Sequence, residues 1–212
     1  MDIRNWHAET LGEKVVNALE KNGFKAVYFS DKDAAAQYVL EFINDGMKVG
    51  IGGSTTLDEL ELPAKAAEKG AVVLNHNVAH LTPEEKLEIR RQQLLSDVFL
   101  CSANGITLDG YLVNIDATGN RIGAMTFGPE KVIIVAGVNK ICKDVDSAFN
   151  RIETVAAPQN NKRLNRPNPC VATGYCMDCK GATRICKIYS VIKRKPTETD
   201  VEVVIVGQSL GY

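Results

Sequence analysis

Four cysteines in one short segment form the pattern in this chain best suited to chemistry. Cys170, Cys176, Cys179 and Cys186 follow the order C-x5-C-x2-C-x6-C and make up four of the 6 cysteines. A C-x2-C pair with two further thiolates can bind zinc tetrahedrally or hold an iron–sulfur cluster. The spacing matches neither the paired C-x2-C motifs of zinc ribbons nor the ferredoxin pattern. We therefore predict a metal site, an iron–sulfur cluster or alternatively zinc, while a metal-free group of thiols stays open.

The other two cysteines, Cys101 and Cys142, stand on or beside predicted strands, and we interpret them as small side chains of the core. The first ten residues, MDIRNWHAET, contain no apolar run or small-residue cleavage site, and no apolar stretch reaches the roughly 20 residues of a membrane span. We therefore expect a cytoplasmic protein, in which cysteines are reduced thiols or metal ligands rather than disulfides.

Polar side chains gather after two short apolar runs, residues 98–101 and 132–136. The composition of both runs is typical of neighbouring strands in a parallel sheet that is buried on both faces. In open α/β sheets ligands bind outside the carboxyl ends of the strands, where glycines let the backbone approach the ligand. We therefore predict a polar small-molecule pocket, and its candidate residues in this region are Asn104, Thr107, Asn114, Asp116, Asn139 and Lys140.

A glycine-rich turn, GIGGST at residues 50–55, follows a predicted strand and opens a helix. The first backbone N–H groups of a helix are unpaired and can hold a phosphate or carboxylate. The turn is neither a dinucleotide-binding fingerprint nor a Walker loop, which needs a lysine. Tight strand-to-helix packing with Ser54 as the N-cap explains it about as well. The candidate anion-binding residues here are Gly52, Gly53, Ser54 and Thr55.

Two adjacent arginines, Arg90 and Arg91, lie on a predicted helix at residues 82–96. Both border an apolar stripe formed by Leu87 and Leu94. An arginine in that position usually extends to solvent or pairs with a carboxylate, but it can also bind an anionic ligand with two hydrogen bonds. The sequence does not separate the two, and we keep both as candidates.

Predicted strands and helices alternate along the first 150 residues, which indicates a doubly wound, three-layer α/β/α fold with a mostly parallel sheet. We expect an α/β core domain at residues 1–157. Residues 158–212 begin with a polar, proline-bearing loop and lead through the cysteine segment to two β-rich runs, 188–193 and 201–206. These runs are predicted to form a hairpin in a small C-terminal extension that packs on the core. A second hairpin is expected around the turn at 117–120.

The balance of charges excludes some classes of partner. With 25 basic and 26 acidic residues the net charge is −1, so nothing favours nucleic acid or a membrane surface. A small anionic molecule or a protein is the expected partner, and the sequence also allows a homo-oligomer. Only His7, His76 and His80 are histidines, none in the predicted pocket, so acid–base or triad chemistry through histidine has little support. We assign no catalytic residue.

These motifs in combination resemble the lactate-utilisation (LUD) domain family, also known as DUF162, of the YkgG or lactate-utilisation protein C type. The shared segments are the glycine-rich turn, the arginine pair, DVFLCSANGITLDGYLVNID, GNR, GPEKVIIVAGVNKI and AFNR, and they cover nearly the whole chain. The segment CVATGYCMDCKGATRIC and the end VGQSLGY resemble a stand-alone branch from anaerobic bacteria.

The resemblance implies a fold of the group that includes NagB, ribose-phosphate isomerase (RpiA) and CoA transferases, in agreement with the alternating strands and helices. It also implies a link to the oxidation of lactate to pyruvate, in which family members act with iron–sulfur partner subunits. The acidic nucleophile motif of a CoA transferase is absent from the sequence.

We therefore expect a component of lactate utilisation, an iron–sulfur-linked oxidoreductase subunit whose pocket binds a small anionic substrate or cofactor. One alternative is a ligand-binding or regulatory module in which the cysteines hold structural zinc. Another is an enzyme of the same fold group that handles CoA or phosphosugars.

Overall fold

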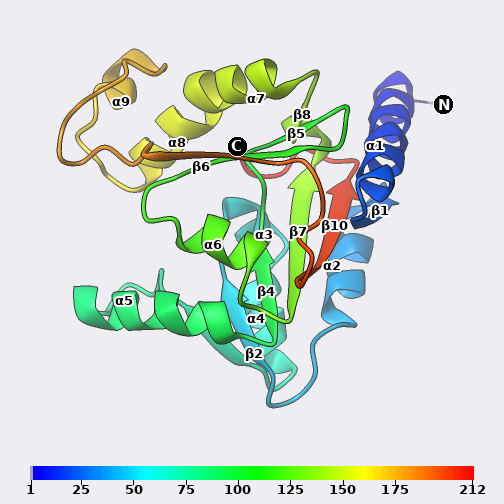
Figure 1. Ribbon diagram of the computed structural model, residues 1–212, viewed down its shortest axis with the longest axis horizontal. Helices are drawn as coiled ribbons and strands as arrows, with labels where there is room; N and C mark the ends of the chain where they lie inside the picture. Colours follow the sequence, from blue (N-terminus) through cyan, green and yellow to red (C-terminus); the bar gives the residue numbers. More distant parts are fainter. Residues whose placement is uncertain (1) are drawn as a thin grey trace.

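The main sheet of the protein has six strands in the order β1-β10-β7-β4-β2-β3, and every neighbouring pair is parallel. The computed structural model describes residues 2–212. Because the strands are parallel, their carboxyl ends lie at one edge of the sheet, which faces the region of α7 and α8 in Figure 1. The strands are β1 (Lys25–Phe29), β2 (Lys48–Ile51), β3 (Val72–Asn75), β4 (Val98–Cys101), β7 (Lys131–Gly137) and β10 (Asp200–Val206).

Both faces of this sheet are buried, and β7 shows why its sequence is almost entirely apolar. Alternate side chains of a strand point to opposite faces. Ile133 and Val135 pack with the helices of one face, whereas Val132, Ile134 and Ala136 pack with those of the other. The first face is covered by α2 (Lys32–Leu40), α3 (Thr55–Glu59) and α4 (Leu62–Glu68), and the second by α1 (Ile3–Lys21) and α6 (Asn120–Thr126).

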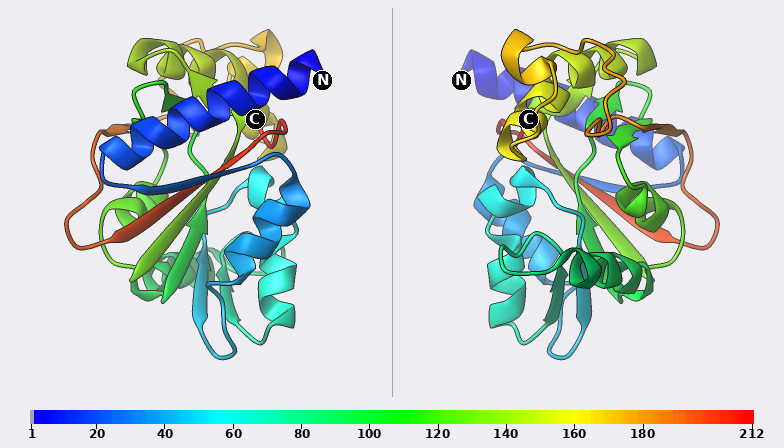
Figure 2. Two further views of the ribbon diagram at one scale, coloured as in Figure 1. Left: turned by 90° about the vertical axis from the view of Figure 1, so that its right-hand side faces the viewer. Right: turned by 90° about the vertical axis from the view of Figure 1, so that its left-hand side faces the viewer.

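A second, smaller sheet packs against the face that carries α1, with the strand order β8-β5-β6-β9. Its outer side is covered by α7, a π-helical stretch and α8, which form one continuous helical segment (Figure 2). The elements of this layer are β5 (Gly105–Thr107), β6 (Leu112–Asp116), β8 (Ile141–Cys142), β9 (Ile188–Ile192), α7 (Val145–Arg151), the π-helix (Ile152–Ala156) and α8 (Ala157–Arg163).

Two further helices lie outside these layers, α5 (Pro83–Gln92) and the short α9 (Cys170–Thr173). The predicted α/β fold with a parallel central sheet is confirmed, and the two runs interpreted as neighbouring strands are β4 and β7. Cys101 and Cys142 are buried, as expected of core residues. Within the described residues, no helix is both long and apolar enough to span a lipid bilayer.

The hairpin predicted around residues 117–120 is wrong, because the chain after the turn is helical. Gly119 has a left-handed φ of 84° immediately before α6, a conformation that glycine adopts without steric cost. The Asp116 carboxylate accepts a hydrogen bond from the Ile122 N–H at 3.0 Å, which stabilises the first turn of that helix. Strand β6 pairs instead with β5 and β9.

The hairpin predicted from the two last β-rich runs is also wrong, because β9 and β10 belong to different sheets. Strand β10 lies between β1 and β7 in the main sheet. Ion pairs support this register at the start of the strands: Lys131 contacts Asp200 at 3.0 Å and Glu202 at 2.8 Å. The strands after residue 158 therefore complete both sheets.

Helix α1 begins at Ile3 with Asp2 as the N-cap. Two expectations for other helices are wrong. On α5 the capping box of Thr82 and Glu85 is present, but Leu87 is 44% exposed and no α5 side chain is buried. The polar run after residue 157 begins as α8, since a proline is accepted in the first turn of a helix.

The central position of β10 can be tested by truncating one of its core side chains. Ile205 is fully buried, so Ile205→Ala should lower the free energy of unfolding by about 2–5 kcal/mol through lost burial and a new cavity. Urea denaturation measures the change. The control is Val72→Ala on β3, whose side chain is 51% exposed. This variant should lose less stability than Ile205→Ala, and equal losses would contradict the central position of β10.

Candidate functional site

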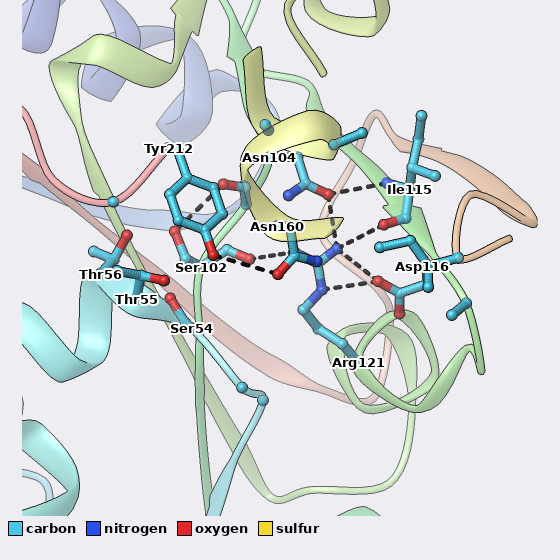
Figure 3. A pocket seen from close by; sticks show the side chains of 18 of the residues that line it. Ser54, Thr55, Thr56, Ser102, Asn104, Ile115, Asp116, Arg121, Asn160 and Tyr212 are labelled. Carbon is cyan, nitrogen blue, oxygen red and sulfur yellow. Dashed lines mark hydrogen bonds and ion pairs between the residues drawn. The ribbon is translucent and has the colours of Figure 1, made fainter. Parts of the chain in front are cut away.

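A cavity of about 200 Å³ lies at the carboxyl edge of the main sheet. Its walls come from the turn after β2, the residue after β4, the segment that leads from β6 into α6, the start of α8 and the C-terminal tail. Figure 3 shows these segments converging, with Ser54, Thr55 and Thr56 opposite Arg121 and Asp116. Side chains that are far apart in sequence therefore meet in one pocket.

The structure brings eight of the twelve predicted pocket residues into the lining of this cavity. They are Gly52, Gly53, Ser54, Thr55, Arg90, Asn104, Asp116 and Lys140. It separates the two arginines that the sequence left equivalent, because Arg90 lines the pocket whereas Arg91 is exposed and lies 3.9 Å from Glu88 on the same helix.

Three more predicted residues lie behind the pocket wall and hold it in place. Asn114 is fully buried, and its Oδ1 accepts a hydrogen bond from the Asn104 N–H at 3.1 Å. Asn139 Oδ1 accepts from the Leu210 N–H at 3.1 Å and so fixes the C-terminal tail. The Thr107 hydroxyl accepts from the N–H of Tyr111 within the second sheet. The protein itself uses these three side-chain oxygens, whereas Asn114 Nδ2 is buried without a hydrogen-bond partner among the described residues.

Arg121 organises one wall of the pocket. Its guanidinium forms an ion pair with Asp116 at 2.6 Å and donates to Asn104 Oδ1 at 2.8 Å and to the Ser102 carbonyl at 2.8 Å (Figure 3). The side chains of Arg121 and Asp116 are only 12% and 8% exposed, so the pair is far less screened than one on the surface. Its hydrogen bonds link the ends of β4 and β6 to α6.

Lys140 is the most deeply buried charged side chain of the pocket, at 3% exposure. Its Nζ donates to the hydroxyls of Thr56 at 2.7 Å and Ser102 at 2.8 Å. Burial, together with the nearby Arg151 and Arg121, lowers the pKa of Lys140 to about 7, although Glu59 acts in the opposite direction. A lysine with this pKa changes charge near neutral pH.

The lining is strongly basic. Among the described lining residues, three arginines and one lysine accompany a single side-chain carboxylate, that of Asp116; the four basic residues are Arg90, Arg121, Lys140 and Arg163. Among the described residues, Arg90 and Lys140 have no carboxylate within ion-pair distance. The buried hydroxyl of Thr55 also lacks a hydrogen-bond partner. This arrangement can accept an anion that has several hydrogen-bond acceptors.

His76 borders the pocket from the end of β3 and is kept neutral by its surroundings. Its side chain is 7% exposed, and Gln93 Nε2 lies 3.0 Å from its Nδ1. Burial, and then the positive charge of Arg90, lower the pKa of His76 to about 4. Because a neutral imidazole has one ring nitrogen without a proton, His76 can accept a hydrogen bond here.

Several lining residues were not among the predicted pocket residues. Ser102 and Arg121 stand in the same polar segments as predicted residues, so their place after a strand end is the signal that finds them. Asn160, Arg163 and Tyr212 come from α8 and the tail, where Arg163 Nε donates to the Tyr212 hydroxyl at 2.6 Å. No local sequence pattern predicts that these three residues line the pocket, because the contact between α8 and the tail depends on how the tail folds back.

The four cysteines of the C-terminal segment line one small cavity of about 10 Å³, next to the first. All are free thiols. Within residues 2–212, however, no three cysteine, histidine or acidic side chains lie close enough together to hold a metal ion as they stand. Metal binding therefore requires these four side chains to move closer to one another.

Arg184 fixes the loop that carries the C-x2-C pair. Its guanidinium donates to the carbonyls of Cys179 and Cys186, both at 2.6 Å, and forms an ion pair with Asp178 at 2.6 Å. The N–H of Asp178 donates to the sulfur of Cys176 at 3.4 Å. Hydrogen bonds of this kind to sulfur tune the reduction potential of iron–sulfur clusters.

This chain belongs to the LUD domain family, because the family model matches residues 12–206. Membership implies involvement in lactate utilisation. A solved structure of a DUF162 family protein from Deinococcus radiodurans is similar over 94% of this chain and 98% of its own, with a TM-score of 0.50 and 10% sequence identity. At that identity the likeness concerns the fold alone. Among curated proteins no match was found.

The neutral state of His76 predicts a loss of stability in acid. Between about pH 4 and 6.5 the unfolded chain binds a proton that the folded protein does not, so the free energy of unfolding falls as the pH is lowered through this window, by up to roughly 3 kcal/mol. Urea denaturation at pH 7 and pH 4.5 measures how much the free energy of unfolding falls between the two. This fall should be smaller for His76→Gln than for the unmodified protein. His7→Gln, at an exposed position, should show the same fall as the unmodified protein.

Proposed function

We propose that this chain is an iron–sulfur-linked oxidoreductase subunit of lactate utilisation, of the YkgG type with a C-terminal four-cysteine motif. In this proposal the pocket at the sheet edge binds a small anionic substrate or cofactor. One observation carries it: Ala157, Ile185 and Cys186 line both the pocket and the cysteine cavity. A ligand in the pocket and a metal centre at the cysteines would be separated by a single layer of side chains.

The charge of the pocket supports an anionic ligand. Arg90, and Lys140 when it is protonated, have no carboxylate partner within ion-pair distance in the described chain. A carboxylate can accept from a guanidinium through two parallel hydrogen bonds, and such charge-assisted bonds are about twice as strong as neutral ones. Thr55 adds a hydroxyl that is free to bond to a ligand. Lactate, with its carboxylate and hydroxyl, matches these donors.

The chemistry of the four thiols supports a metal centre. Burial raises the pKa of Cys186 to about 11 and also raises that of Cys170, and the neighbouring cysteines add to both effects. The raised pKa disfavours the thiolate form of Cys170 and Cys186 unless a cation compensates its charge. A metal ion does so because it binds the thiolate form. We propose Cys170, Cys176, Cys179 and Cys186 as the ligands.

The electron balance indicates the kind of partner. Oxidation of lactate to pyruvate removes two electrons and two protons, whereas an iron–sulfur cluster bound at the cysteines would accept one electron at a time. A single cluster is therefore insufficient for a complete turnover. We propose that further iron–sulfur protein subunits receive the electrons.

Structural zinc is the second candidate for the cysteines, and the size of their cavity favours it. About 10 Å³ is room for roughly one water-sized sphere, which suits a single ion better than a cluster of several atoms. In that case the metal would fix the cysteine segment against α8, and the protein would be a ligand-binding or regulatory module.

Metal analysis of anaerobically purified protein separates these candidates. We expect iron and acid-labile sulfide in stoichiometric amounts, and a visible absorption band that dithionite bleaches. Cys179→Ser should lose the metal, whereas Cys101→Ala, which changes a core cysteine outside the lining of the cysteine cavity, should retain it. Zinc without sulfide would support the second candidate, and the absence of any stoichiometric metal would contradict both.

The two arginines of α5 offer a matched test of the pocket. Loss of one charged hydrogen-bonding partner costs about 1.5–3 kcal/mol, so Arg90→Ala should weaken anion binding roughly 10- to 150-fold. Arg91→Ala should have no effect, because that side chain lies outside the pocket. Thermal shift and calorimetry with lactate, sugar phosphates and CoA esters would identify the ligand class. Equal effects of the two substitutions, or no binding of any anion, would contradict the proposed site.

A further inference from the structure

Ser102 and Lys140 form a pair in the pocket whose chemistry lactate oxidation does not require. Ser102 directly follows β4, and Lys140 lies beyond the end of the neighbouring strand β7. Lys140 Nζ lies 2.8 Å from Ser102 Oγ and 2.7 Å from Thr56 Oγ1. A nucleophile within hydrogen-bond reach of a base that a third group orients is the arrangement typical of nucleophilic catalysis, and serine–lysine pairs are a known variant.

The hydrogen bonds around Thr56 set the direction in which a proton can move. The Thr56 hydroxyl donates to the Leu210 carbonyl at 3.4 Å, so its oxygen is left to accept from Lys140. A neutral amine that donates one N–H to Thr56 can turn its lone pair toward Ser102. The Ser102 hydroxyl, which otherwise points to the Ala103 carbonyl at 3.3 Å, can rotate and donate to Nζ.

The surroundings of Lys140 favour the neutral amine that such a base needs. Burial is the main cause that disfavours its protonation, followed by the charges of Arg151 and Arg121, whereas Glu59 and the Cys101 thiol act in the opposite direction. No carboxylate of the described chain lies within 4.0 Å of Nζ. With a pKa of about 7, an appreciable fraction of Lys140 is neutral at physiological pH.

We propose that Ser102 and Lys140 are a nucleophile and general base that cleave small esters or thioesters carrying a carboxylate or phosphate. Ser102 Oγ attacks the acyl carbon while its proton passes to Lys140 Nζ. Nζ then returns the proton to the departing alkoxide or thiolate, which leaves an acyl group on Ser102. Water, deprotonated by Lys140 in the same way, releases the acid in a second step. The balance requires no oxidant or other co-reactant.

The surroundings of the pair indicate this class of substrate. Both residues line the cavity, so an acyl group can reach them from the pocket. Arg121 Nη1 donates to the Ser102 carbonyl at 2.8 Å and so fixes the main chain that carries the nucleophile. Arg90 lies in the same lining and can bind the anionic group of the substrate. This activity is distinct from the proposed redox role, although it uses the same pocket.

Two small acylating and phosphorylating probes test the proposal on the full-length protein. Diisopropyl fluorophosphate and p-nitrophenyl acetate should both modify Ser102, as located by peptide mass spectrometry. Ser102→Ala should abolish the modification, and Lys140→Met should slow it roughly 100-fold or more, the usual contribution of a general base. The rate should rise with pH and level off above about pH 7, where Lys140 is neutral, and Lys140→Met should remove this dependence.

Controls make each outcome decisive. Ser190→Ala and Lys143→Met alter a serine and a lysine outside the pocket and should react like the unmodified protein. Melting temperatures would show that the variants are folded. If neither probe modifies Ser102, or if the label lies on Lys140 or on surface residues, the proposal is overturned. Lactate binding measured on the same samples keeps the tests separate: bound lactate without acylation would contradict this inference and leave the proposed function standing.

Discussion

The parallel direction of all six strands in the main sheet is the constraint on which the candidate site depends. Strands buried on both faces are largely apolar, and in β4 and β7 the one charged side chain is Lys131, which lies at the opposite end of β7 from the pocket. The first positions available for chemistry are those just after the strands end. Because every strand ends at the same edge, the segments after β2, β4 and β7 place Thr56 and Ser102 within hydrogen-bond distance of Lys140.

The pocket contains two kinds of positive charge. Arg121 is neutralised by Asp116 and bonds to main-chain and side-chain oxygens, so it acts as part of the wall. Arg90 and Lys140 have no carboxylate partner within the described chain, so their desolvation is not compensated by the protein. The paired Arg121 organises the pocket before a ligand binds, and the unpaired Arg90 and Lys140 favour a ligand that carries negative charge.

Features of the structure that depend on local sequence patterns could be predicted from the sequence. The buried strands, the glycine-rich turn after β2 and most of the pocket residues follow from hydrophobic runs, glycines and the geometry of parallel sheets. The pairing of β9 and β10 could not be predicted in this way, because both are β-rich runs close in sequence and only the packing of the whole chain assigns them to different sheets. Arg90 and Arg91 likewise occupy neighbouring positions on one helix, and the docking angle of α5 decides which one faces the cavity.

The place of β10 has a consequence for how the protein acquires its structure. Among the strands of residues 2–212, β1 pairs with β10 alone. Lys25 lies opposite Glu202, so most of the polypeptide separates the two strands. Contacts between such distant segments carry a large loop-closure entropy and are associated with slow folding. During synthesis on the ribosome, α1 and β1 emerge long before β10 and keep their apolar side chains exposed until it arrives. We therefore expect a chaperone to bind the exposed apolar side chains of the nascent chain until β10 is synthesised.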